Sequence, residues 1–83
     1  MKVKNVTIYT AKWCPWCQKA KAYFRQNNIS FVEKDVESDE KYGQEVMHKS
    51  GQLSIPVIDI DGTIIVGFDR PAIDRALGLA VAA

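Results

Sequence analysis

The chain has 83 residues, of which 47% are hydrophobic and 25% are charged, and its formal net charge at pH 7 is +1. This length suits one hydrophobic core and no second, so we expect residues 1–83 to form a single domain. The composition excludes a disordered chain, and the balanced charge gives no indication of a nucleic-acid or membrane partner.

The first half of the chain predicts a strand, a helix and a second strand. Residues 3–10 (VKNVTIYT) are rich in β-branched and aromatic residues, which favour a strand. A helical pattern follows from Pro15 to about Asn28, because proline suits a first helical turn and apolar residues recur at helical spacing. Residues 29–36 (ISFVEKDV) alternate in the manner of a second strand.

The second half predicts a helix, a hairpin and a last helix. Ser38 is the expected N-cap of the helix, and Gly51 is its expected stop. PVIDI and TIIVGF flank Asp61-Gly62, a dipeptide typical of a tight hairpin turn. The last helix is expected from Asp69 or Arg70 to Ala76, with a frayed end in the tail LAVAA.

The resulting order is β-α-β-α-β-β-α. It combines two parallel strands, joined by a helix, with an antiparallel hairpin. We therefore expect an α/β protein with a mixed four-stranded sheet flanked by helices, which is the outline of the thioredoxin fold. Architecture of this kind does not by itself assign a function.

The motif CPWC contains the only two cysteines, Cys14 and Cys17. Cys14 lies at the start of the first helix, where main-chain N–H groups and the helix dipole favour a thiolate. We therefore expect Cys14 to be the more acidic and exposed thiol, and Cys17, one turn further on, to be more buried. This arrangement predicts a nucleophile and a resolving thiol in disulfide exchange.

Three other interpretations of the pair fit less well. A structural zinc site needs four ligands, and apart from the two cysteines the chain offers only His48, in a different helix. A permanent disulfide conflicts with the expected compartment, which is the reducing cytoplasm, since no export signal or membrane span is apparent. Two inert buried cysteines are less expected at this spacing, so redox chemistry is the favoured hypothesis.

On CPWC, SIPV and VGFD, the chain resembles the glutaredoxin family over nearly its full length. The resemblance implies that Cys14 is the nucleophile and Cys17 the resolving thiol. It also matches Pro56 to the proline that family members hold in cis beside the active site. That geometry would leave the Ile55 backbone free to pair with an extended peptide or with glutathione.

The chain also departs from the glutathione-using members, which follow the last strand with two glycines and an acidic residue. Here the stretch is Gly67-Phe68-Asp69-Arg70, and Lys12 stands two residues before Cys14 instead of three. The Gly-Phe and Arg-Pro pairs resemble redoxins that serve ribonucleotide reductase and are recharged by thioredoxin reductase. The substrate or glutathione site implied by the resemblance comprises Lys12, Trp16, Ile55, Pro56, Gly67, Phe68 and Asp69.

The sequence therefore predicts a monomeric thiol-disulfide oxidoreductase that reduces protein disulfides or glutathione mixed disulfides. It is expected to hold no metal and no permanent cofactor, and to take electrons from glutathione or thioredoxin reductase. Two alternatives stay open. One is an iron–sulfur carrier, a dimer ligated through Cys14 and glutathione. The other is a dedicated electron donor to one enzyme, such as ribonucleotide reductase.

Overall fold

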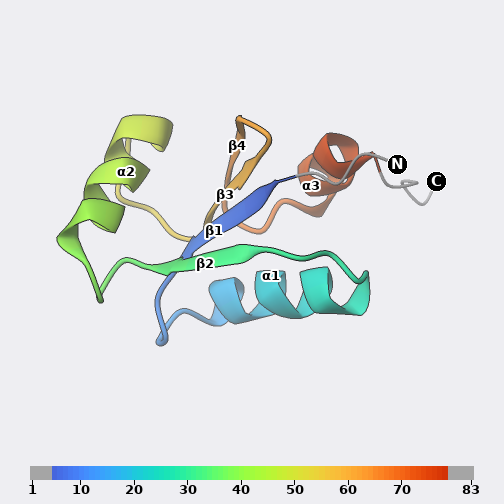
Figure 1. Cartoon of the computed structure of the whole chain (residues 1–83), viewed down its shortest axis with the longest axis horizontal. Coiled ribbons are helices and arrows are strands. Elements are labelled where there is room, and N and C mark those ends of the chain that lie inside the picture. The colour runs from blue at the N-terminus through green and yellow to red at the C-terminus, as the bar shows by residue number, and fades with distance from the viewer. Residues whose placement is uncertain (1–4, 79–83) are drawn as a thin grey trace.

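The computed structural model describes residues 5–78, in which four strands and three helices follow the expected order (Figure 1). The elements are β1 (Val6–Thr10), α1 (Pro15–Gln26), β2 (Val32–Asp35), α2 (Glu40–Ser50), β3 (Val57–Ile60), β4 (Thr63–Val66) and α3 (Arg70–Leu77). Residues 3–4 of the expected first strand and the tail LAVAA lie outside the described residues.

The strands form one sheet in the order β2-β1-β3-β4. β1 pairs with β2 in parallel, and β3 pairs with both β1 and β4 in antiparallel fashion. Figure 1 shows this sheet between the helices. The predicted mixed sheet, with one parallel pair and one hairpin, is confirmed.

The sheet is covered on both faces because its strands carry apolar side chains in alternating directions. On one face, Ile8 and Ile58 belong to a buried cluster with Phe24 of α1 and Ile73 of α3. On the other face, Tyr9 and Val57 pack with Val46 of α2. The start of α1 lies at one end of the sheet, next to the loop that leaves β2 and the loop that enters β3.

The N-cap of α2 differs from the one predicted, whereas α1 ends where it was expected to end. Asp39, not Ser38, is the N-cap of α2: its carboxylate accepts the Lys41 N–H at 2.9 Å, whereas the Ser38 hydroxyl donates to the Asp35 carbonyl at 2.8 Å. The predicted N-cap was wrong because Ser38 is used in the preceding turn. α1 ends at Gln26, and Asn28 follows with a φ of 56°.

The hairpin and the glycine stop of α2 were predicted correctly. Asp61 and Gly62 both have positive φ, 49° and 91°, as a two-residue hairpin turn requires. Gly51 ends α2 in the left-handed conformation. β2 is shorter than predicted, but Ile29 and Phe31 of the preceding connection still pack against the core.

Polar contacts hold α2 onto the sheet. The buried Tyr9 donates its O–H to Glu45 of α2 at 2.6 Å, and Lys34 donates to the same carboxylate oxygen at 3.0 Å. The Tyr9 hydrogen bond and then the Lys34 hydrogen bond hold the pKa of Glu45 below its ordinary value. Lys49 of α2 pairs with Asp59 of β3 at 2.7 Å, so α2 is tied to three strands.

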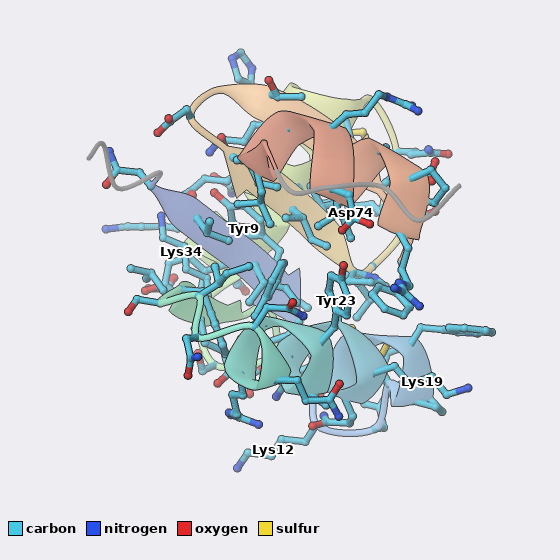
Figure 2. The ribbon with its side chains drawn as sticks, turned by 90° about the vertical axis from the view of Figure 1, so that its right-hand side faces the viewer. Tyr9, Lys12, Lys19, Tyr23, Lys34 and Asp74 are labelled. Atoms are coloured by element: carbon cyan, nitrogen blue, oxygen red, sulfur yellow. The ribbon has the colours of Figure 1, made fainter. Side chains whose placement is uncertain are left out.

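A second polar contact joins α1 to α3. Tyr23 donates its O–H to the carboxylate of Asp74, a residue only 6% exposed (Figure 2). The Arg70 guanidinium lies 4.7 Å from the centre of the Tyr23 ring.

Within residues 5–78, none of the helices has the length and apolar character needed to cross a membrane.

The Tyr23–Asp74 contact predicts a stability effect. Tyr23→Phe should lower the free energy of unfolding by about 1–3 kcal/mol, because it leaves a buried carboxylate without this donor. Urea unfolding followed by circular dichroism measures the change. Tyr42→Phe is the matched control, since the Tyr42 hydroxyl has no hydrogen-bond partner among residues 5–78. Equal losses in the two variants would refute the assignment.

Candidate active site

Cys14 is placed by the turn between β1 and α1. Its N–H donates to the Ala11 carbonyl at 3.2 Å, and it is the N-cap residue of α1, with extended backbone angles. Its Sγ accepts the main-chain N–H of Cys17 at 3.2 Å. The predicted arrangement, in which helix N–H groups and the helix dipole point at the Cys14 sulfur, is therefore present.

The prediction that Cys14 is exposed was wrong. Cys14 is 4% exposed and Cys17 is 0% exposed, so both thiols are buried, although Cys14 is the more accessible of the two. The capping contact explains this, because it turns the Cys14 side chain back over the helix end. Val36 and Ile55 then pack against the cysteine pair.

Cys17 occupies the inner position that the helical pattern predicted. Burial, and after it a hydrogen bond with Cys14, raises the pKa of Cys17 to about 11, although the Thr10 hydroxyl opposes this shift. Thr10 Oγ1 is itself buried and has no hydrogen-bond partner that meets ordinary geometry. Cys17 is therefore a protonated thiol at neutral pH, and it lies further inside the protein than Cys14.

Five of the residues assigned to the substrate site lie together. One hollow beside the cysteine pair is lined by Trp16, Ile55, Pro56, Gly67 and Phe68. The Ile55–Pro56 peptide bond is cis. Neither the N–H nor the C=O of Ile55 has a hydrogen-bond partner among residues 5–78. An extended chain beside the cysteines would find a free donor and acceptor there.

Gly67 and Phe68 form part of the lining of this hollow. Gly67 has a φ of 82°, a conformation that side-chain-bearing residues rarely adopt, and its N–H donates to the Pro56 carbonyl at 2.8 Å. Phe68 packs edge-on against Tyr23, with ring centres 5.8 Å apart, and it also contacts the core. Phe68 therefore both lines the hollow beside the site and packs into the core.

The remaining two predicted residues do not line this hollow. Lys12 is exposed, and its side chain extends away from the body of the molecule (Figure 2). The Asp69 carboxylate accepts the Ala72 N–H at 3.3 Å and so caps α3. The cation nearest the exposed Trp16 ring is Lys19, whose Nζ lies 4.4 Å from the ring centre. Trp16 itself is 56% exposed.

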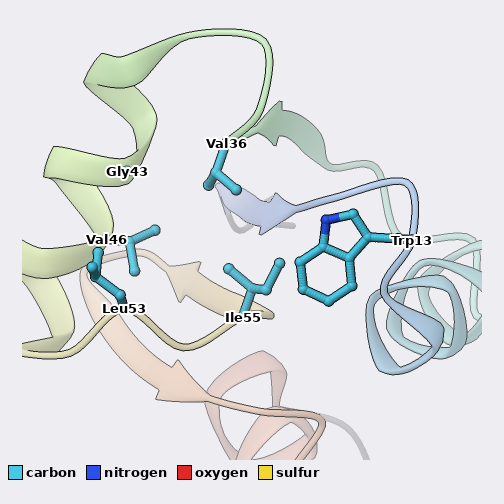
Figure 3. A pocket seen from close by; sticks show the side chains of 6 residues that line it. All are labelled: Trp13, Val36, Gly43, Val46, Leu53 and Ile55. Carbon is cyan, nitrogen blue, oxygen red and sulfur yellow. The ribbon is translucent and has the colours of Figure 1, made fainter.

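A second hollow on the other side of Ile55 was not predicted. Figure 3 shows its lining, which comes from the loop before α1, the loop after β2, α2 and the loop before β3: Trp13, Val36, Gly43, Val46, Leu53 and Ile55. Its only signal in the sequence is a pair of apolar residues in loops, Trp13 and Leu53.

Among the described residues, no three His, Cys, Asp or Glu side chains gather as a metal site would require.

Comparison with known proteins agrees with this geometry. The Glutaredoxin family model matches residues 6–65. An uncharacterized glutaredoxin-like 8.6 kDa protein in a rubredoxin operon of Clostridium pasteurianum is 44% identical over 72 residues, which cover 87% of this chain and 96% of that protein. Glutaredoxin 3 of Escherichia coli strain K12 is 37% identical over 65 residues, or 78% of each chain.

Solved structures show the same fold. The thioredoxin-like protein BC3987 superposes with a TM-score of 0.81 at 27% identity, covering 88% of this chain and all of the other. The sheet order, the helices and the position of the cysteine pair together define a thioredoxin fold. The chain therefore belongs to the glutaredoxin family of thiol-disulfide oxidoreductases.

Proposed function

We propose that the chain reduces disulfides of polypeptides through a cycle in which Cys14 and Cys17 alternate between two thiols and one disulfide. The observation that carries this proposal is the hydrogen bond from the Cys17 N–H to Cys14 Sγ, because it directs the helix N-terminus at one sulfur only. The second sulfur is fully buried one turn behind. One thiol is thus equipped to attack and the other to resolve.

In the first step, the Cys14 thiolate attacks one sulfur of a substrate disulfide. A bond forms between Cys14 Sγ and that sulfur, the substrate S–S bond breaks, and the other substrate sulfur leaves as a thiolate. The Cys17 N–H and the positive end of the α1 dipole stabilise the negative charge on Cys14 before attack. The free N–H and C=O of Ile55 would align the substrate chain beside the cysteines.

In the second step, Cys17 loses its proton and attacks Cys14 Sγ. The Cys14–Cys17 disulfide forms, and the second substrate sulfur leaves and takes up a proton. Two electrons have then passed from the protein to the substrate, and an external thiol or reductase must return them. Burial is the main cause of the raised pKa of Cys17 and persists in the mixed disulfide, so this step should be faster at higher pH.

The site favours polypeptides over glutathione. Glutathione carries two carboxylates and one ammonium group at neutral pH, whereas the hollow beside Trp16 is lined by uncharged residues. A charged group placed against such a surface loses hydration without gaining an ion pair. We therefore propose that a thioredoxin-reductase-type flavoenzyme reduces the oxidised protein faster than glutathione does. Measuring the rate at which each of the two reduces the oxidised protein would test this proposal.

The proposed division of roles predicts distinct behaviour of two variants toward Ellman's disulfide. The reduced wild type should release about two equivalents of thionitrobenzoate, and Cys17→Ser about one, with a stable adduct on Cys14. Cys14→Ser should react at least about 100-fold more slowly, because its remaining thiol is buried and protonated. Absorbance of the released thiolate measures all three, and rapid reaction of Cys14→Ser would reverse the assignment.

The raised pKa of Cys17 predicts how the second step depends on pH. A thiol is protonated below its pKa, and the burial that raises the pKa of Cys17 persists in the adduct on Cys14, so the second phase of thionitrobenzoate release should accelerate as the pH rises from about 7 to about 9. Stopped-flow absorbance on the wild type resolves this phase from the first. A second phase whose rate does not change with pH would contradict a protonated resolving thiol.

Several finer expectations remain predictions. These are the cytoplasmic location, the monomeric state, a dedicated role toward one enzyme, and the iron–sulfur carrier. The carrier would require Cys14 of two protomers to bind one cluster. Anaerobic reconstitution followed by visible absorption spectroscopy distinguishes a cluster-bound dimer from a colourless protein.

A further inference from the structure

The second hollow is lined mainly by apolar groups. Its six lining residues carry no charged side chain, and its volume is about 150 Å³. A cavity of about this volume with an apolar lining can hold a molecule the size of benzene. Trp13 and Leu53, on opposite sides of the hollow, are 65% and 71% exposed, so two large apolar side chains face water beside it.

This hollow adjoins the reacting sulfur. Val36 and Ile55, which line it, also pack directly against the cluster of Ala11, Cys14 and Cys17. Trp13 immediately precedes Cys14 in the chain, and Figure 3 shows its ring directed toward Ile55. A group bound in the hollow therefore sits beside the disulfide that Cys14 attacks.

Ile55 connects the hollow to a substrate backbone. Its side chain lines the hollow, while its N–H and C=O have no partner among the described residues. A polypeptide that satisfies these two groups runs past the hollow in extended form. Successive residues of an extended chain are about 3.3 Å apart, so the residues adjoining the substrate cysteine fall within reach of it.

We propose that this hollow, formed by Trp13, Val36, Gly43, Val46, Leu53 and Ile55, binds a large apolar side chain that lies within two residues of the substrate cysteine. It thereby selects polypeptide disulfides by their flanking sequence. The inference rests on the proposed dithiol exchange and adds a determinant of specificity to it. The occupant is a side chain of leucine or phenylalanine size, because an acidic or basic group would lose its hydration there without an ion pair.

Gly43 offers a direct way to fill the hollow. It lies within α2, and a Cβ added there meets no atom within 4 Å. Replacing a helical glycine also favours the helix, so Gly43→Leu should fold while its side chain occupies the space. Gln44→Leu is the matched control: it adds the same side chain at the next position of α2, on an exposed residue that does not line the hollow.

The test uses synthetic peptides whose single cysteine is joined to thionitrobenzoate by a disulfide. One leucine is moved through the two positions on each side of the cysteine, and the reference peptide has serine at all of them. Reduced protein is mixed with each peptide without other reductant. Cys14 bonds to the peptide sulfur, thionitrobenzoate leaves as a thiolate, and Cys17 then releases the peptide thiol. The measured quantity is the rate for each leucine peptide relative to the serine peptide.

For the wild type, at least one leucine position should raise this relative rate about tenfold, and aspartate at the same position should lower it below the serine value. Gly43→Leu should bring the relative rate close to one, and Leu53→Ser should reduce it. Gln44→Leu should retain the wild-type preference. These results together support the binding of an apolar side chain in the hollow.

Other outcomes overturn the inference. Thionitrobenzoate release at equal rates from all peptides would show that exchange occurs without selection by the hollow. A preference that survives in Gly43→Leu would place the selection elsewhere. Loss of a dimer in Gly43→Leu by sedimentation, with the peptide preference intact, would make the hollow a contact between copies of the chain. Failure of every protein to release thionitrobenzoate would refute the proposed function itself.

Discussion

The hydrogen bond from the Cys17 N–H to Cys14 Sγ is the contact on which the account of this site depends. One geometry gives the two cysteines different surroundings, since a residue that caps a helix receives the main-chain donors while the residue one turn later faces the core. Cys14 therefore lies at the positive end of α1, and Cys17 lies in a buried place that raises its pKa. The same contact turns Cys14 inward, so its side chain is only 4% exposed.

Ile55 gives this site two sides. On one side lie Trp16, Pro56, Gly67 and Phe68, and on the other lies the apolar hollow against α2. Both sides lack charged side chains, whereas the nearest lysines, Lys12 and Lys19, point outward or lie over the Trp16 ring. Because α2 is tied to the sheet through Tyr9–Glu45 and Lys49–Asp59, the second side has a fixed wall. An uncharged surface of this kind is the basis for proposing a polypeptide substrate over a small charged thiol.

Most of the fold could be predicted from the sequence, because local sequence patterns determine the strands, helices and turns. Strand alternation, Pro15 at a helix start and Asp61-Gly62 at a turn each act over a few residues, and the fold followed from their order. The exposure of Cys14 was mispredicted, since capping turns its side chain inward and residues distant in sequence, Val36 and Ile55, cover it. The hollow against α2 was missed for the same reason: it exists only where three loops and one helix meet.

The most direct measurement of the central claim compares the reactivity of the two thiols in the unmodified protein. Reduced protein is treated with limiting iodoacetamide near neutral pH, digested, and the modified sulfur is located by tandem mass spectrometry. Cys14 should carry nearly all of the label while Cys17 stays unmodified. Equal labelling, or faster labelling of Cys17, would contradict the proposed division between an attacking and a resolving thiol.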